Sequence, residues 1–493
     1  MKKFLAGLVL GVLIGGVIGI ALGALLSPMH PTEEDSDIPP AEFQTEATPG
    51  DTSQPPAERE TAAKETPLTI EAGDYRIKAY ADGTCEIAAY SGSASILEVP
   101  ERIEGYRVTS IGIYAFQYQT ALSSITIPGT VTSLESHAFY GCKGLRSFTI
   151  PDSVTAIGDA AFYDCDGLTS LVIPASVTSV GDNPFQSCDQ IRSIIVPSGH
   201  PVLEVVDGVL FDKVEKRMIC RPSALPGQHY DIPQGTRSLG VWAFSGDTEL
   251  TTITVPDSVE SIGKDAFAGC ASLRSIVIPD RVEVLEDYLF SGCTSLASVT
   301  LPEGLRAIGS SFGGCTALCS IEIPASVTTI DLNPFWGCDN LTRITLPANH
   351  PVFEVVDGVL FDKVDSRLVS YPCSRTDGSY TIPWGTQKIG EGAFAHSKYL
   401  TSVTIPDSVV SIGETAFGNC SALTRVVIPD SVTSIGNNAF LYCRALTSVV
   451  IPESVTFIGG SAFYECTRLT LQVRAETYAH QYAKGRGIPF TTY

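Results

Sequence analysis

The residues with the clearest chemical potential are cysteines, and most of them follow a strict spacing. Stacked strands lie about 4.8 Å apart, whereas the Cβ atoms of a disulfide need about 3.8 Å and zinc needs a tetrahedral cluster. A line of thiols at strand spacing suits neither chemistry. We therefore interpret these cysteines as small buried side chains that fill a turn, and not as a redox or metal array. Ten of the 14 cysteines form this series: Cys142, Cys165, Cys188, Cys270, Cys293, Cys315, Cys338, Cys420, Cys443 and Cys466.

Two histidines and a row of acids could likewise have either a structural role or a catalytic or metal-binding one. His200 and His350 begin near-identical segments, HPVLEVVDGVLFDK and HPVFEVVDGVLFDK, 150 residues apart, which favours a duplicated structural turn over a catalytic pair. Acids that follow the prolines of the repeat suit solvated turns, although a row of calcium sites is conceivable. Because no His-x-x-x-His, nucleophile elbow or phosphate-binding glycine loop is present, we expect no catalytic residues, no cofactor and no metal. The acids are Asp152, Asp257, Asp280, Glu303, Asp407, Asp430 and Glu453.

These residues are positioned by an internal repeat of about 23 residues. Its unit reads close to L-T-S-V-x-I-P-D-S-V-T-S-I-G-x-x-A-F-x-x-C-x-x, and two intervals lengthen to 36 residues. The alternating S-V-T-I-P stretch predicts a short strand that proline ends, V-T-S-I-G predicts a second strand on the opposite side, and A-F-x-x-C predicts a helical turn. One unit is too small to close a core, so the units must stack as the coils of a solenoid.

The signatures L-x-x-I-x-I-P, S-V-T-S-I-G and A-F-x-x-C resemble those of the BspA-like leucine-rich repeat family, over residues 69–493. The resemblance implies a strand-rich repeat solenoid that is capped at both ends. We expect an N-terminal β cap with the first repeat at 69–116, the solenoid at 117–470 and a C-terminal cap at 471–493. The Asp-Gly dipeptides of the two longer intervals predict hairpin-like inserts near 198–232 and 348–382.

The N-terminus is predicted to be a membrane segment followed by a stalk. Two lysines precede the 23 uncharged residues 4–26, enough to span a bilayer. We expect residues 1–27 to anchor the chain as a single-pass transmembrane helix with the repeats extracellular; the alternative is a cleaved signal and secretion. Residues 28–68 hold eight prolines and ten acids against two bases, which predicts a disordered stalk. Glycines at every fourth position favour self-association in the membrane, at Gly7, Gly11, Gly15, Gly19 and Gly23.

The net charge and the outward residues of the first strand indicate which kinds of partner the chain could bind. With 32 basic and 54 acidic residues, the chain is poorly suited to nucleic acid. The outward positions of L-x-S-V-x-I carry serine, threonine and scattered arginines, and arginine pairs well with carboxylates and sulfates. We expect these strands on the concave side, where they would bind an extracellular protein or glycan. The resemblance implies adhesion to host or extracellular-matrix proteins or to other cells; the alternative is a structural spacer of the cell envelope or biofilm. The candidate contacts are Arg146, Arg192, Arg274, Arg343 and Arg425.

Overall fold

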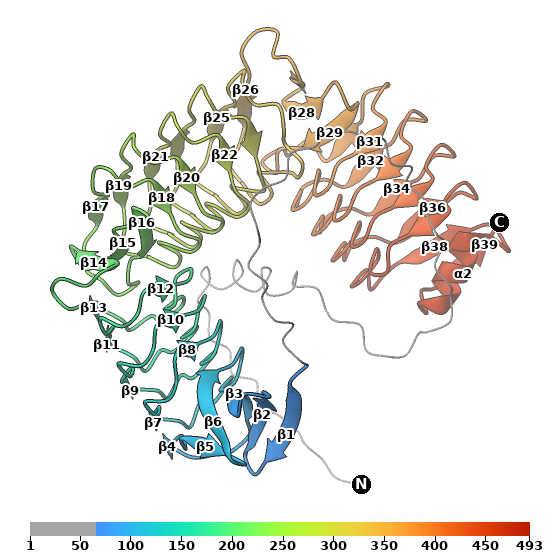
Figure 1. The fold of residues 1–493 in the computed structure, drawn as a ribbon. Coiled ribbons are helices and arrows are strands. Elements are labelled where there is room, and N and C mark those ends of the chain that lie inside the picture. The colour runs from blue at the N-terminus through green and yellow to red at the C-terminus, as the bar shows by residue number, and fades with distance from the viewer. Residues whose placement is uncertain (1–65) are drawn as a thin grey trace, which may run out of the picture.

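The computed structural model describes residues 66–493, and among these residues no helix is long and apolar enough to cross a membrane. The predicted anchor, its five glycines and the stalk up to residue 65 lie outside the described residues. The stalk boundary at residue 68 was slightly late, because Leu68 already begins the first strand, β1 (Leu68–Ala72). The described residues form a single open arc of stacked coils (Figure 1).

Most coils contain two short strands on opposite sides, as the repeat predicts. The first strand precedes the proline, and parallel partners pair at the repeat spacing, as Ser170 does with Ser193. The first strands are β4 (Ile96–Glu98), β7 (Ser124–Thr126), β9 (Ser147–Phe148), β11 (Ser170–Val172), β13 (Ser193–Ile195), β17 (His229–Asp231), β19 (Thr252–Thr254), β21 (Ser275–Val277), β23 (Ser298–Thr300), β25 (Ser320–Glu322), β26 (Arg343–Thr345), β30 (Ser379–Thr381), β32 (Ser402–Thr404), β34 (Arg425–Val427), β36 (Ser448–Ile451) and β38 (Thr470–Val473).

The second strands follow the proline turn and form a parallel ladder of their own. The turn before each is closed locally, as by the N–H of Val177, which donates to the carbonyl oxygen of Pro174 at 3.1 Å. The second strands are β6 (Tyr106–Ile111), β8 (Ser133–Leu134), β10 (Ala156–Ile157), β12 (Ser179–Val180), β18 (Ser238–Leu239), β20 (Ser261–Ile262), β22 (Val284–Leu285), β24 (Ala307–Ile308), β31 (Lys388–Ile389), β33 (Ser411–Ile412), β35 (Ser434–Ile435) and β37 (Phe457–Ile458).

The A-F-x-x-C segment is a hydrogen-bonded turn and not the predicted helical turn. Gly141 inside this segment has a φ of +68°, and His137 just before it has a φ of +58°, values that a right-handed helix cannot contain. The N–H groups of His137, Phe139 and Gly141 donate to carbonyl oxygens of the next coil at 2.7–3.0 Å. The segment is therefore held by its neighbour along the solenoid, and its local hydrogen bonds only close the bend.

The arc curves in the direction opposite to the one expected. In Figure 1, β7, β9, β11 and β13 follow the outer edge, and β8, β10 and β12 lie inside it. The expectation that the L-x-S-V-x-I strands line the concave side was therefore wrong. The physical reason lies in the hydrogen bonds between coils. On the inner side five backbone N–H groups between residues 132 and 141 donate to neighbouring coils, whereas a first strand spans only two to four residues. The longer bonded stretch keeps the inner side closely spaced.

The core is a stack of the repeated apolar residues. Thirteen phenylalanines of the A-F position lie inside, and consecutive rings are nearly parallel, as for Phe417 and Phe440 with ring centroids 5.1 Å apart. The stack is interrupted between Phe185 and Phe244 and again between Phe335 and Phe394, where the two inserts occur. The buried residues accordingly form three clusters along the arc.

Each insert is a three-stranded antiparallel unit that rejoins the second ladder. The first contains β14 (Leu203–Val206), β15 (Val209–Asp212) and β16 (Arg217–Cys220), and the second contains β27 (Phe353–Val356), β28 (Val359–Asp362) and β29 (Arg367–Ser370). Asp207 and Gly208 at the first tip both have positive φ, 49° and 84°, the conformation of a tight hairpin turn. Since β16 then pairs with β18 in parallel, the insert continues the solenoid.

The two ends of the solenoid are covered by different structures. At the N-terminal end, β1, β2 (Tyr75–Ala79) and β3 (Thr84–Tyr90) form an antiparallel sheet, and β3 also pairs with β6 in parallel. The short strand β5 (Arg102–Ile103) pairs antiparallel with the beginning of β6. At the C-terminal end, α2 (Tyr478–Gly485) buries Ala479 and Ala483, and β39 (Phe490–Thr492) pairs with β38. Both structures shield strand edges that an open solenoid would expose.

Candidate binding surface

The ten repeated cysteines are core residues with one shared contact. Each Sγ lies 2.9–3.2 Å from the carbonyl oxygen of the A-F phenylalanine of the preceding coil, as Cys293 does from Phe267 at 3.0 Å. All ten are buried and unbridged, and burial raises the pKa of the Cys293 thiol to about 12. The thiols therefore donate to turn carbonyls, which is a structural role.

The repeated histidines close the inserts. His200 and His350 are buried, and each Nε2 lies 3.1–3.2 Å from a proline carbonyl oxygen, that of Pro174 or Pro324. Each Nδ1 accepts the backbone N–H of the residue three positions on, at 2.9–3.0 Å. A neutral imidazole satisfies both contacts, so these histidines fix a turn. The acids after the prolines are exposed, and the described residues contain no group of three metal-ligating side chains.

The five candidate arginines share one face but do not converge. All five are exposed, and each lies in or directly before a first strand. Arg146, Arg192 and Arg274 directly precede a first strand, whereas Arg343 and Arg425 begin one. No two occupy adjacent coils, and no described acid forms an ion pair with any of them. They form two broken columns along the face.

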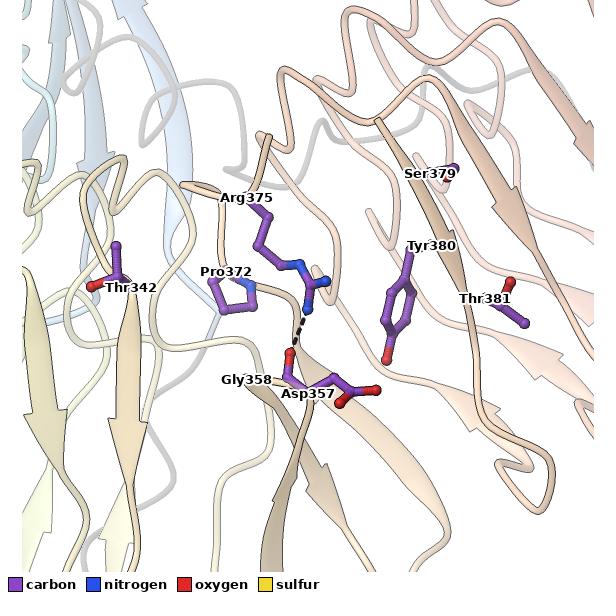
Figure 2. Close-up of a pocket in the computed structure, with 8 residues that line it drawn as sticks. All are labelled: Thr342, Asp357, Gly358, Pro372, Arg375, Ser379, Tyr380 and Thr381. Atoms are coloured by element: carbon purple, nitrogen blue, oxygen red, sulfur yellow. Dashed lines mark hydrogen bonds between the residues drawn. The ribbon is translucent and has the colours of Figure 1, made fainter. Parts of the chain in front are cut away.

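The first-strand ladder is interrupted at the second insert, and a hollow of about 600 Å³ lies there. It opens between β26 and β30, with the tip of the hairpin β27–β28 at its base (Figure 2). One of the candidate arginines, Arg343, is the next residue in the chain after Thr342, which lines this hollow. The lining residues are Thr342, Asp357, Gly358, Pro372, Arg375, Ser379, Tyr380 and Thr381.

Arg375 organises the hollow. Its Nη1 donates to the carbonyl oxygen of Asp357 at the hairpin tip, and its Nε donates to Asp377 Oδ2 at 3.0 Å (Figure 2 shows the first of these bonds). The guanidinium also lies 5.4 and 5.5 Å from the ring centroids of Tyr371 and Tyr380, within cation–π range. These contacts hold a cation at the edge of the hollow in one orientation.

Tyr380 contributes its aromatic ring to the wall of the hollow. Its side chain is buried, and its hydroxyl has no hydrogen-bond partner among the described residues. Burial raises the pKa of this phenol to about 12, so the hydroxyl stays protonated. The groups with which the hollow can donate and accept hydrogen bonds are the hydroxyls of the exposed residues Thr342, Ser379 and Thr381.

The first insert has the same frame with a different lining. The buried Pro372 and Tyr380 recur 150 residues earlier as Pro222 and Tyr230, and so does the Asp-Gly tip. The lining residues Thr342, Arg375, Ser379 and Thr381 instead correspond to Arg192, Leu225, His229 and Asp231. Leu225 packs on Gly208 so closely that a Cβ there would lie 2.7 Å from its Cδ1. Sequence reasoning missed Arg375 because it lies outside the repeat; comparing the two inserts position by position would have found it.

The model of the BspA type leucine rich repeat region matches residues 107–213, 227–342, 309–354 and 371–480. No curated protein sequence matches the chain.

Among solved structures, a leucine rich cell surface protein from Faecalibacterium prausnitzii is 28% identical, with 85% of this chain and 98% of that chain covered and a TM-score of 0.45. A leucine-rich repeat protein from Bacteroides ovatus is 25% identical, with 88% and 100% covered and a TM-score of 0.37. The pneumococcal vaccine antigen PcpA is 16% identical, with 87% and 98% covered and a TM-score of 0.38. Because the family model covers well over half of the sequence and its units coincide with the coils described above, this chain belongs to the BspA-type leucine-rich repeat family.

Proposed function

We propose that this chain is a cell-surface binding protein that holds an extracellular protein or glycan through the first-strand face, centred on the hollow at the second insert. The apolar N-terminal segment after Lys2 and Lys3 supports a membrane-tethered, extracellular repeat domain. A solenoid offers a long rigid surface for recognition. Binding, and not catalysis, is the role that this surface supports.

The observation that carries the proposal is the difference between the two inserts. They share a buried histidine and tyrosine, the proline and the Asp-Gly tip, but differ at four lining positions that are exposed or half-buried in the second insert. A pure spacer places no demand on these side chains beyond solubility. An insert that recognises a ligand needs its own set of polar groups at that place.

The chemistry of the hollow favours a ligand rich in hydroxyl, amide or carboxylate groups. Thr342, Ser379 and Thr381 present exposed hydroxyls, and Arg375 adds a fixed cation that faces two aromatic rings. Arg343 on β26 lies next to Thr342 and extends the polar surface along the strand. The proposal thus retains one of the five candidate arginines as a direct contact and leaves the other four as more distant members of the same face.

The test uses the full chain in a nonionic detergent, screened against immobilised extracellular-matrix proteins and a glycan array. Arg375→Leu places in the second insert the residue that the first insert already accommodates, so the fold should survive. We expect this change to abolish binding to the captured ligand, while Arg146→Ala, an exposed residue beside a first strand near the N-terminal end of the solenoid, leaves it intact. Binding that persists in the Arg375→Leu protein would show that the hollow is not the contact, and the absence of any ligand in the screen would favour the spacer alternative.

A further inference from the structure

Five rings cluster on three successive coils at the N-terminal end, away from the hollow. They belong to the turns after the second strands: Tyr114 and Tyr118 in one coil, His137 and Tyr140 in the next, and Tyr163 in the third. We call these five residues the aromatic ladder.

The rings of the aromatic ladder contact one another between coils. Tyr140 and Tyr163 stack at 4.7 Å with an interplanar angle of 4°, and Tyr114 stacks on His137 at 5.0 Å. Tyr118 stands at 88° to Tyr140, with ring centroids 5.2 Å apart. The rings therefore form one continuous surface in which neighbouring planes face different directions.

The outer members of the aromatic ladder remain open to solvent. Tyr118 is 63% exposed and Tyr114 is 41% exposed, beside Ile113 at 57%. Tyr118 also lies against the backbone of Gly141, where a Cβ would come within 2.8 Å of the tyrosine Cδ1. The neighbouring coil thus leaves space for this ring without covering it. Exposed aromatic surface of this kind is a common mark of an interaction site.

This aromatic character is local and is not a property of the repeat. In the coils between the two inserts, the position of Tyr140 and Tyr163 is occupied by Ser245, Ala268, Ser291, Gly313 and Trp336. The packing of the coils therefore does not require a tyrosine at this position. The aromatic ladder is therefore a feature of these three coils that the fold of the repeat does not require.

The charge around the aromatic ladder is negative. Asp159 raises the pKa of His137 slightly, but burial is the larger effect and lowers it, so this imidazole is neutral at pH 7. Asp164 and Asp166 lie on the third coil, and Lys143 bridges both carboxylates at 2.7 and 3.2 Å. Three carboxylates against one already paired ammonium leave a net negative potential beside ring faces that are themselves electron-rich.

We propose that the aromatic ladder binds lysine or arginine side chains of a basic segment on a partner protein. Ring faces attract ammonium and guanidinium groups within about 6 Å, and the surrounding carboxylates strengthen that attraction and draw the partner in. The site is independent of the hollow at the second insert. Each can therefore fail without affecting the other.

The experiment measures binding of an octa-arginine peptide to the full chain in nonionic detergent, with an octa-citrulline peptide as the uncharged probe of the same shape. The double variant Tyr114→Leu, Tyr118→Leu keeps the net charge and removes the two exposed rings. We expect the arginine peptide to bind about fivefold to thirtyfold more weakly to this variant, as two cation–π contacts imply.

The matched control is Tyr464→Leu. Tyr464 occupies the repeat position of Tyr140 and Tyr163 near the other end of the arc and is 56% exposed. This variant should bind the arginine peptide as the unmodified chain does, because non-specific attraction of a polycation to an acidic protein is the same in both.

Three results would overturn the proposal. They are equal binding of the citrulline peptide, unchanged arginine binding by the double variant, and an equal loss in the Tyr464→Leu control. Binding of maltoheptaose that depends on Tyr118, without arginine binding, would identify the aromatic ladder as a sugar platform instead. Circular dichroism of each variant confirms that the fold is retained before binding is compared.

Discussion

The buried ion pair between Arg221 and Asp247 joins the first insert to the coil that follows it. Asp247 stands where later coils have the repeated cysteine, and its side chain is 0% exposed; that of Arg221 is 2% exposed. One carboxylate oxygen accepts Arg221 Nη1, and the other accepts the N–H groups of Glu249 and Leu250, both at 3.1 Å. Arg221 Nη2 also donates to the carbonyl oxygens of Leu225 and Gly227 at 2.8 and 3.1 Å.

Asp247→Ala should therefore be strongly destabilising. It leaves a guanidinium buried without its counter-charge and removes the acceptor of two backbone N–H groups. Removing one partner of a buried ion pair costs about 3–5 kcal/mol, and the two orphaned N–H groups place the expected loss toward the upper end of that range.

The coils around the end of the second insert show how both charges can be replaced. There Tyr371 and Ser397 replace Arg221 and Asp247, and the Tyr371 ring packs 5.0 Å from Phe394 and 5.1 Å from Tyr380. Phe244 and Tyr230 occupy the matching positions after the first insert. We expect the double variant Arg221→Tyr, Asp247→Ser to recover most of the loss, since replacing both charges removes the desolvation penalty.

The assay is urea unfolding of the full chain followed by circular dichroism, combined with hydrogen exchange of the Leu250 amide. Exchange is needed because a repeat array can open locally without unfolding throughout. Faster exchange at Leu250 in Asp247→Ala, with protection restored in the double variant, is the expected outcome. The reasoning fails if the single variant stays within about 1 kcal/mol of the unmodified chain, or if the double variant is no more stable than the single one.

Three further predictions concern the thiols and one acid. In the native chain a thiol reagent should label the exposed Cys319, while the ten repeated cysteines react only after denaturation; rapid native labelling of those ten, detected by peptide mass mapping, would contradict a core role. Cys293→Ser should lower the free energy of unfolding by about 1–3 kcal/mol, because it places a more polar group in a buried turn; urea titration measures this, and a larger loss would indicate a role beyond packing. Burial raises the pKa of Asp265 to about 6, so as pH rises the unfolded chain ionises first and stability is lost between about pH 4 and pH 6. Asp265→Asn should therefore raise the melting temperature at pH 8 and change it little at pH 4, and an equal effect at both pH values would contradict the shift.

Much of the fold follows from local pattern. Pairs such as Ile173 and Val177 lie inside because alternation and the proline turn point them to the same side of the coil. The buried phenylalanine stack, the two strands per coil and the duplicated inserts all follow from a spacing that can be read along the chain. The same spacing correctly predicts that the repeated cysteines are buried and that the five candidate arginines are exposed.

The site and the curvature depend on contacts between coils, which a repeat pattern does not specify. The concave side is the side on which neighbouring coils lie closer together. That spacing depends on the hydrogen bonds that residues between 132 and 141 donate to neighbouring coils. Arg375 meets Asp357 and Tyr380 only because the second insert folds back between β26 and β30. The sequence by itself thus determined the coil and its core, because those interactions repeat within one unit. The hollow and the aromatic ladder were decided by tertiary structure, because their members come from different coils or from segments distant in the chain.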